Sequence, residues 1–337
     1  MLKKKLNKYS FASDLDESSW QTGLSELSNS NVYCSWGWGC YKESLGWDIH
    51  RIRFSRTDKI DLVGCLQVQV KKFRYIKSRI LLIQGGVFCD SSIFSDSFVF
   101  VTELHEYLSL RKYDLLAIDS ADEEDRIVLG LLELGYKPIA SSSGYTYMLD
   151  LCLSEEELMQ GLSRNWRHNL KRSRKKGLHV RHVGSDKVPR ERSLKKLAHM
   201  YGQLTERKKF SQAVDFQYFI PIATNDLNYK IVEVLSDNKV VAIRVGYISG
   251  KNGLDFLAAS SAEAKKNYAT YLALWELIMR SKNEGVERFD CGGIDPYNNT
   301  GVYYFKRGLG GTLNLPKLTW INSDSSLIKR LFANRMF

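Results

Sequence analysis

The sequence predicts a layered α/β protein made of two tandem domains with mixed, mainly antiparallel sheets. Three observations support this fold class. Each half contains three consecutive strand patterns followed by a helix, a strand and another helix. The second half repeats the order of the first, which indicates a repeat on the scale of a domain. A basic helical segment separates the halves, so we expect domains at 1–153 and 154–337.

The first half begins with bulky residues at helical spacing in 31–46. Apolar and β-branched runs then predict three strands in succession, a helix, a strand, a helix and a last strand. These segments are 47–54, 60–73, 79–86, 95–110, 113–120, 122–135 and 144–153.

The second half follows the same order. The pair Asp237-Asn238 predicts a tight hairpin turn, and Gly285 is the expected C-terminal cap of the longest helix. The predicted strands are 178–183, 229–237, 239–249, 253–260, 286–293 and 312–321, and the predicted helices are 190–208, 215–222, 262–285 and 300–308.

The segment 155–177 joins the halves and begins the second domain. Its acids come first and its bases last, as a helix dipole favours. The segment from Ser163 to Arg181 contains eight Lys and Arg residues, Arg181 included, and no acid. Trp166 and Leu170, four residues apart, predict that one side packs while the other stays basic. We expect this basic side, which carries Arg167, to bind an anionic substrate.

Composition limits the possible partners. The chain has 337 residues and a formal net charge of +11, which favours anionic partners such as nucleic acid, nucleotides or a membrane surface. No apolar run approaches the roughly 18 residues of a transmembrane helix, and the basic start lacks the apolar stretch of a secretory signal. The six cysteines are scattered and form no CxxC pair. We therefore interpret them as reduced thiols and expect no metal site. We therefore expect a cytoplasmic protein, with the inner face of the membrane as an alternative place.

Four segments carry a family resemblance. "VYCSWGWGCYKESLGW" (32–47) resembles the N-terminal signature of the Fem-type aminoacyltransferases, with Cys34 in place of the usual glutamine. "RILLIQGGVFCD" (79–90) resembles their next segment, although Gln84-Gly85-Gly86 stands where Arg-Gly-Pro is usual. "LTERKKF" (204–210) resembles their Thr-x-Arg-x-x-Phe. "ERFDCGG…GVYYFKRGLGG" (287–311) resembles their C-terminal signature closely.

The resemblance covers most of the chain and implies both fold and reaction. It implies two domains similar to the GNAT acyltransferase fold, whose strand and helix order the two halves match. It implies transfer of an amino acid from aminoacyl-tRNA, the donor substrate, to an amino group of a UDP-linked or lipid-linked peptidoglycan precursor. No cofactor is implied, and neither a GxSxG motif nor a Cys-His pairing is visible, consistent with direct aminolysis. The first domain would bind the acceptor.

The reaction needs a group that stabilises a tetrahedral oxyanion and a group that handles one proton. Lys306 matches the lysine of the family's Phe-Lys motif, which reaches the acyl-transfer site. Asp290, at the end of a predicted strand, is the candidate proton acceptor, with Asp255 in the neighbouring strand as a weaker rival. Each has a plainer interpretation: Lys306 as a helix-end cation favoured by the dipole, and Asp290 as a cap for Gly292 and Gly293.

Three further residues are substrate-binding candidates. Lys42 and Arg207 match family positions that bind a nucleotide diphosphate, for which a point charge and a planar fork are well suited. Tyr268, near the start of the longest helix, could hydrogen-bond either substrate. Surface cations are the alternative for the first two, because the chain has 49 Lys and Arg residues.

Two other functions remain open. An acyl-CoA-dependent N-acyltransferase acting on a sugar or polysaccharide precursor would have the same fold. Its glycine-rich pyrophosphate loop is missing, because "ASSAEAKKNYAT" (259–270) stands at that site without a glycine. A basic RNA-binding protein without activity is the second alternative, although no RNA-binding signature with spaced aromatic residues is present.

Overall fold

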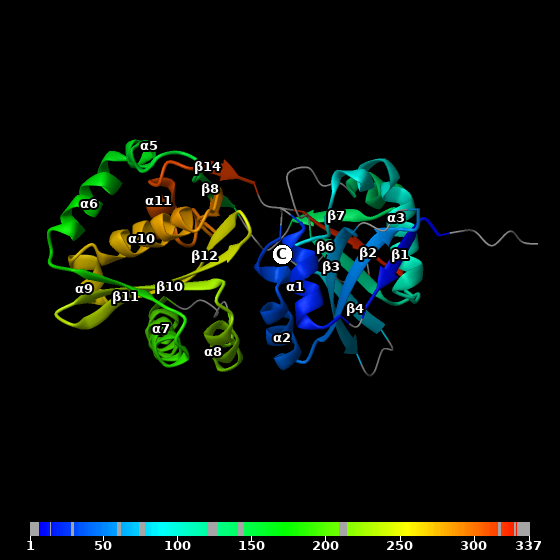
Figure 1. Cartoon of the computed structure of the whole chain (residues 1–337), viewed down its shortest axis with the longest axis horizontal. Coiled ribbons are helices and arrows are strands. Elements are labelled where there is room, and N and C mark those ends of the chain that lie inside the picture. Colours follow the sequence, from blue (N-terminus) through cyan, green and yellow to red (C-terminus); the bar gives the residue numbers. More distant parts are fainter. Residues whose placement is uncertain are drawn as a thin grey trace, which may run out of the picture. The chain divides into compact units, whose positions relative to one another are not determined.

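A computed structural model gives the structure of the chain, which divides into two compact units (Figure 1). One unit comprises 1–143 and 316–337, and the other comprises 144–315. The structure describes residues 7–13, 15–27, 30–58, 62–73, 78–119, 127–140, 145–208, 214–315, 318–326 and 328, except the side chains of 91, 92, 94, 140, 207 and 208.

The first unit is built on one sheet with strand order β1-β2-β3-β4-β6-β15-β7, and β5 pairs with β3 at its side. All neighbours on this path are antiparallel except β4 and β6, which are parallel. Its strands are β1 (Tyr9–Ala12), β2 (Asp48–Arg56), β3 (Leu62–Phe73), β4 (Ser78–Ile83), β5 (Phe88–Cys89), β6 (Leu115–Asp119), β7 (Lys137–Ala140) and β15 (Leu318–Asn322). Its helices are α1 (Glu17–Ser25), η1 (Val32–Cys34), α2 (Trp36–Ser44), η2 (Ser91–Asp96), α3 (Ser97–Tyr107) and α4 (Val128–Glu133).

The second unit has a seven-stranded sheet with the order β14-β8-β13-β12-β11-β10-β9. Figure 1 shows α10 on one face of this sheet and α7 and α8 on the other. Its strands are β8 (Thr146–Asp150), β9 (His179–Val183), β10 (Tyr229–Ser236), β11 (Lys239–Ser249), β12 (Asn252–Ser260), β13 (Arg288–Asp290) and β14 (Thr312–Asn314). Its helices are α5 (Glu155–Gly161), α6 (Arg164–Arg174), α7 (Lys187–Lys208), α8 (Phe216–Asn225), α9 (Ala262–Lys266), α10 (Ala269–Asn283) and α11 (Thr300–Arg307).

The two sheets have the same topology, and each contains one strand that comes from the other half of the sequence. In both, the fourth and fifth strands of the path are the parallel pair, β4–β6 and β12–β13. The strand after the fifth comes from the other half of the chain in both cases. β8 follows the first half and inserts between β13 and β14, while β15 follows the second half and inserts between β6 and β7. The expected repeat and mainly antiparallel sheets are therefore confirmed, but the border expected at 153/154 is displaced to 143/144, with a return at 316.

Several predicted helices and strands are each divided into two elements in the structure. The predicted helix 155–177 is two helices, because Leu162 and Ser163 are extended and Ser163 caps α6. The predicted helix 262–285 breaks at Tyr268, whose φ is +58°. The predicted strand 312–321 is β14 and β15, which belong to different sheets. The patterns missed β1, α1, β5 and β7, and part of the predicted helix 122–135 lies outside the described residues.

Other local predictions are confirmed. Asp237 and Asn238 both have positive φ, at +47° and +61°, which is the conformation of a type I′ hairpin turn. Gly285 has φ +87° and follows the C-cap of α10. Each unit also buries its own apolar core, centred on Phe100 and Leu66 in the first and on Trp166 and Leu274 in the second.

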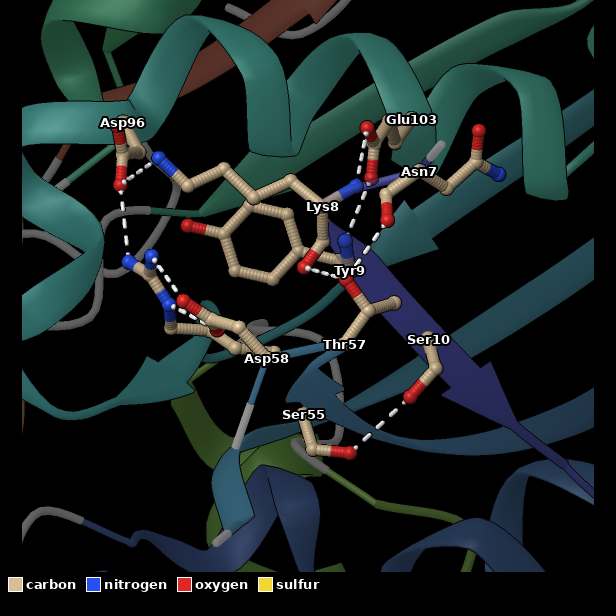
Figure 2. A network of polar contacts seen from close by, with 10 residues as sticks. Asn7, Lys8, Tyr9, Ser10, Ser55, Thr57, Asp58, Asp96 and Glu103 are labelled. Atoms are coloured by element: carbon tan, nitrogen blue, oxygen red, sulfur yellow. Dashed lines mark hydrogen bonds and ion pairs between the residues drawn. The ribbon is translucent and has the colours of Figure 1, made fainter. Parts of the chain in front are cut away.

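The N-terminal strand of the first unit is held by a buried carboxylate (Figure 2). Glu103 of α3 is 8% exposed and accepts the backbone N–H groups of Lys8 and Tyr9 at 2.9 and 2.8 Å. Asp96 joins the same region by ion pairs with Lys8 at 2.6 Å and Arg56 at 3.1 Å. β1 is thus tied to α3 as well as to β2.

We expect Glu103→Gln to lower the free energy of unfolding by about 1–3 kcal/mol, because one buried backbone N–H group then faces an amide donor instead of an acceptor. Urea denaturation with the matched variant Glu106→Gln measures the difference, since Glu106 is exposed on the same helix. Equal midpoints for the two variants would contradict the anchoring role.

Candidate functional site

The candidate site begins where two parallel strands of the second unit separate. β12 pairs with β13 only through Asn252–Leu254 and Arg288–Asp290. The register of β12 against β11 shifts so that Phe256 is an extra residue on β12, and such a bulge redirects the neighbouring side chains. Beyond β13 the chain turns at Gly292, whose φ is +76°. A Cβ atom at Gly292 would lie 2.7 Å from the Asp255 carbonyl oxygen and 3.1 Å from Lys306 Nζ. Only glycine allows this close approach.

Four charged side chains gather around this separation. Arg244 of β11 forms an ion pair with Asp255 of β12, and both are 7% exposed. Lys306, on the last turn of α11, is 9% exposed and donates a hydrogen bond to the Gly293 carbonyl at 2.9 Å. Burial lowers the pKa of Lys306, and the nearby Asp255 opposes that shift. Lys306 is therefore no exposed helix-end cation but a buried one, as a group acting on a developing oxyanion should be.

Asp290 has a clear structural task in this cluster. Its Oδ1 atom accepts the Gly292 N–H at 2.7 Å and the hydroxyl of Thr146, which comes from the exchanged strand β8. These bonds cap the turn after β13, as the plainer interpretation of Asp290 held. A role for Asp290 as proton acceptor stays a prediction.

A pocket of about 450 Å³ lies beside the charged cluster. Its walls come from β11, β12, α10 and α11 and are mainly apolar, including Ala242, Ala258, Ala273 and Phe305. Arg244 also lines the pocket, and its guanidinium lies 5.5 Å from the centre of the Phe305 ring. The pocket thus links an apolar space to the ion pair with Asp255.

The basic helix α6 contributes to the same pocket. Trp166 is buried against Phe305 and Tyr271, and its Nε1 donates to the Phe305 carbonyl at 3.0 Å. This packing fixes α6 so that Asn169 lines the pocket. The basic residues of α6 lie on its other side, and the guanidinium of Arg167 has no polar partner in the described part of the chain.

Tyr268 lies where α6 meets the start of α10. Arg172 donates to its hydroxyl at 2.9 Å and lies 5.5 Å from its ring centre. Tyr268 lines the pocket and adopts a left-handed backbone at the N-cap of α10. A strained non-glycine residue is often found where function maintains it. The predicted residues Lys306, Asp290, Tyr268 and Arg167 all belong to this unit.

The other two predicted residues are Lys42 and Arg207. Lys42 is on α2 of the first unit, where its Nζ atom lies 5.5 Å from the Trp38 ring centre and 5.4 Å from that of Trp47. Burial, with the charge of Lys71, lowers the pKa of Lys42. Arg207 is on α7, but its side chain lies outside the described residues.

Arg244 is not among the residues predicted from the sequence, and Asp255 was predicted there only as a weaker rival of Asp290. A usable signal was present, because each is the single charge inside an otherwise apolar buried strand: Arg244 in "VVAIRVGYI" and Asp255 in "GLDFLAA". A charge that interrupts a buried strand needs a partner or a function. Arg172 could not be distinguished from its basic neighbours by sequence.

The described residues show neither a metal-binding cluster nor a disulfide. No group of three or more His, Cys, Asp and Glu side chains there could hold a metal ion. All six cysteines are free. Among the described helices, none combines the length and apolarity that a membrane crossing requires.

Comparison with known proteins gives one family-model match, in the second unit. Residues 164–307 match the model of the acetyltransferase (GNAT) domain. No curated protein sequence matches the chain. Solved structures that share the fold cover 80–97% of the chain.

The crystal structure of FemX superposes with a TM-score of 0.79 at 15% identity, over 97% of this chain and 100% of that one. A conserved protein of unknown function from Bacteroides thetaiotaomicron gives a TM-score of 0.62 at 10% identity, covering 91% and 95% of the two chains. The C-terminal domain of a protein assigned as a lysylphosphatidylglycerol synthetase from Agrobacterium fabrum gives 0.55 at 14% identity, covering 80% and 84%.

The matched domain defines the class of the protein: the chain contains a GNAT domain and is an acyltransferase. Its fold, two GNAT-like units in tandem, is similar to that of FemX. The fold and the family resemblance expected from the sequence are confirmed.

Proposed function

We propose that the protein transfers an amino acid from aminoacyl-tRNA to an amino group of a peptidoglycan precursor. The observation that carries this proposal is Lys306, a buried cation beside an apolar pocket to which the basic helix α6 contributes Asn169. The likeness to FemX, in fold alone, agrees with it.

The reaction follows from this geometry. The donor ester enters the pocket, and the acceptor amine attacks its carbonyl carbon. A C–N bond forms, the carbonyl oxygen becomes an oxyanion, and Lys306 stabilises that charge in a site with little water. The C–O bond to the ribose then breaks, and the proton lost by the amine goes to the leaving hydroxyl. Asp290 or Asp255 holds the proton in between.

The donor is assigned from charge. The exposed basic residues of α6 face solvent with a single acidic partner among the described ion pairs, Glu155 at 3.9 Å from Arg174. Such a surface binds a polyphosphate chain and does so less tightly as salt rises. Arg167 and Arg172 then contact the backbone of the acceptor stem, and Tyr268 lies between that backbone and the pocket.

The acceptor is assigned from the family resemblance. It implies that Lys42, as a point charge, and Arg207, as a planar fork, are diphosphate-binding positions for a UDP-linked or lipid-linked precursor. A lipid-linked acceptor would bring the protein to the inner face of the membrane from the cytoplasm. The rings of Trp38 and Trp47 lie beside the Lys42 ammonium, which forms no ion pair with a described residue.

A second candidate function uses an acyl-CoA donor. It is favoured by the match of residues 164–307 to an acetyltransferase model and by the position of the pocket at the start of α10. A helix start attracts a pyrophosphate. Against it, Tyr268 occupies that helix start with its ring bound to Arg172.

The test offers purified protein a radiolabelled aminoacyl-tRNA pool and, separately, labelled acetyl-CoA, each with UDP-linked and lipid-linked precursors. We expect label to move from tRNA to a precursor amine. Label moving only from acetyl-CoA would transfer the function to the second candidate. No transfer from either donor would reject both.

A further inference from the structure

The ion pair between Arg244 and Asp255 leaves one carboxylate oxygen without a partner. Asp255 Oδ2 accepts from Arg244 Nη1. Asp255 Oδ1 is buried and has no hydrogen-bond donor among the described residues. A buried oxygen without a donor is energetically costly, so this arrangement is unfavourable unless a bound molecule supplies the missing donor.

The position of this oxygen connects it with the reaction. Asp255 lies beside the bulge where β12 leaves β13, and its partner Arg244 lines the pocket. Lys306 is near enough for Asp255 to act on its charge, but it forms no ion pair within 4.0 Å in the described part. The lysine therefore does not satisfy Oδ1. Asp290 differs, because its Oδ1 already accepts two hydrogen bonds.

We propose that Asp255 Oδ1 is the receptor for a primary ammonium group of a substrate at the acyl-transfer site. An ammonium has three N–H donors and a positive charge, and both complement a fixed carboxylate oxygen. Arg244 acts as a positioning residue, because its bond to Oδ2 holds the carboxylate in place. A plain acyl group such as acetyl carries no such donor and leaves Oδ1 unsatisfied. If the donor supplies the ammonium, the subsite selects aminoacyl over simple acyl groups.

This inference rests on the proposed function and deepens it. Two substrates could supply the ammonium: the donor through its α-amino group, or the acceptor before it loses its proton. A site built to hydrogen-bond one polar group rejects an analogue without it by large factors, on the order of 10²-fold or more. The identity of the bound group can therefore be read from analogues that differ in that group alone.

The first experiment needs neither tRNA nor an acceptor. Saturation-transfer NMR with the full-length protein compares L-alanine methyl ester, N-acetyl-L-alanine methyl ester and methyl L-lactate. We expect saturation of the ammonium ester alone, and its loss in Asp255→Asn. Asp237→Asn, at an exposed turn of the same unit, is the matched control and keeps the preference. The wild-type comparison stands even if Asp255→Asn does not fold. Equal signals from the three esters, no signal from the ammonium ester, or a preference retained by folded Asp255→Asn would each overturn the proposal.

The second experiment assigns the source of the ammonium. Transfer to a UDP-linked precursor is measured from an RNA minihelix charged with alanine or with lactate. If the donor supplies the ammonium, the wild type prefers the alanyl form by at least about 10²-fold, and Asp255→Asn loses that preference. If the acceptor supplies it, both donors react alike and Asp255→Asn raises the KM for the acceptor. Either result supports the subsite. A failed proposed function is distinguishable, because transfer from RNA is then absent while the ester preference remains.

Discussion

Replacing Lys306 by methionine lowers the rate of transfer by about 10²–10³-fold, the usual cost of removing one oxyanion donor. Methionine keeps most of the apolar stem of the lysine, so the packing of α11 is preserved. The donor's KM changes little, because the interaction develops only in the transition state. Steady-state kinetics with the donor identified by the labelling experiment measures the change. Arg307→Met, an exposed neighbour on the same helix, is the matched control. Similar losses in both variants would contradict the role of Lys306.

We also expect Lys306→Met to change how the transfer rate and the free energy of unfolding depend on pH. Burial lowers the pKa of Lys306 in the folded protein below its ordinary value of 10.5. The catalytic cation is thus lost as pH rises through this lowered pKa, so the wild-type rate falls on the alkaline side before an exposed lysine would titrate. Rising pH has the opposite effect on the free energy of unfolding. The unfolded chain binds the proton more readily, so the free energy of unfolding rises between the two pKa values. Lys306→Met removes both effects, which pH–rate profiles and urea denaturation at several pH values detect.

Replacing Arg190 by methionine is expected to lower the free energy of unfolding by about 3–5 kcal/mol, among the largest effects of a single substitution. Arg190 is 1% exposed, and its guanidinium donates to the carbonyls of Ala223, Thr224, Asp226 and Tyr229 at 2.6–3.0 Å. It thereby holds the end of α8 and the start of β10 against α7. Methionine fills the space but removes the guanidinium donors from these buried carbonyls.

The control for Arg190 lies two residues along the helix. Arg192 is exposed on α7, so Arg192→Met should change the free energy of unfolding by less than about 0.5 kcal/mol. Urea denaturation followed by tryptophan fluorescence measures both variants. An effect of Arg190→Met no larger than that of Arg192→Met would refute the assignment of these bonds as essential.

Local rules predicted much of the fold because local interactions decide it. The hairpin at Asp237-Asn238 follows from the turn's need for positive φ, and the end of α10 follows from Gly285. The three-strand runs in each half follow from alternating apolar residues. Lys306 was found by resemblance, and its burial then followed from the packing of α11.

The unpredicted features depend on contacts between distant parts of the chain. Nothing near Tyr268 indicates a helix break, since the left-handed backbone there is associated with Arg172, 96 positions earlier. The pairing of Arg244 with Asp255 depends on the register of two strands and on a bulge at Phe256. The sheet to which β8 belongs is decided by β13 and β14, more than a hundred residues further on.

The reciprocal strand exchange has a consequence for biosynthesis and for the design of fragments. While the ribosome is still making the chain, the first sheet has a gap between β6 and β7 that only β15 can fill. β15 closes it through pairs such as Thr319 with Asp119, 200 residues apart. A fragment cut at 153/154 would carry β8 without its neighbours and leave the other fragment with β15 unpaired. Exposed strand edges of that kind promote aggregation. Neither half is therefore an independent folding unit, and unfolding should be cooperative across both sheets.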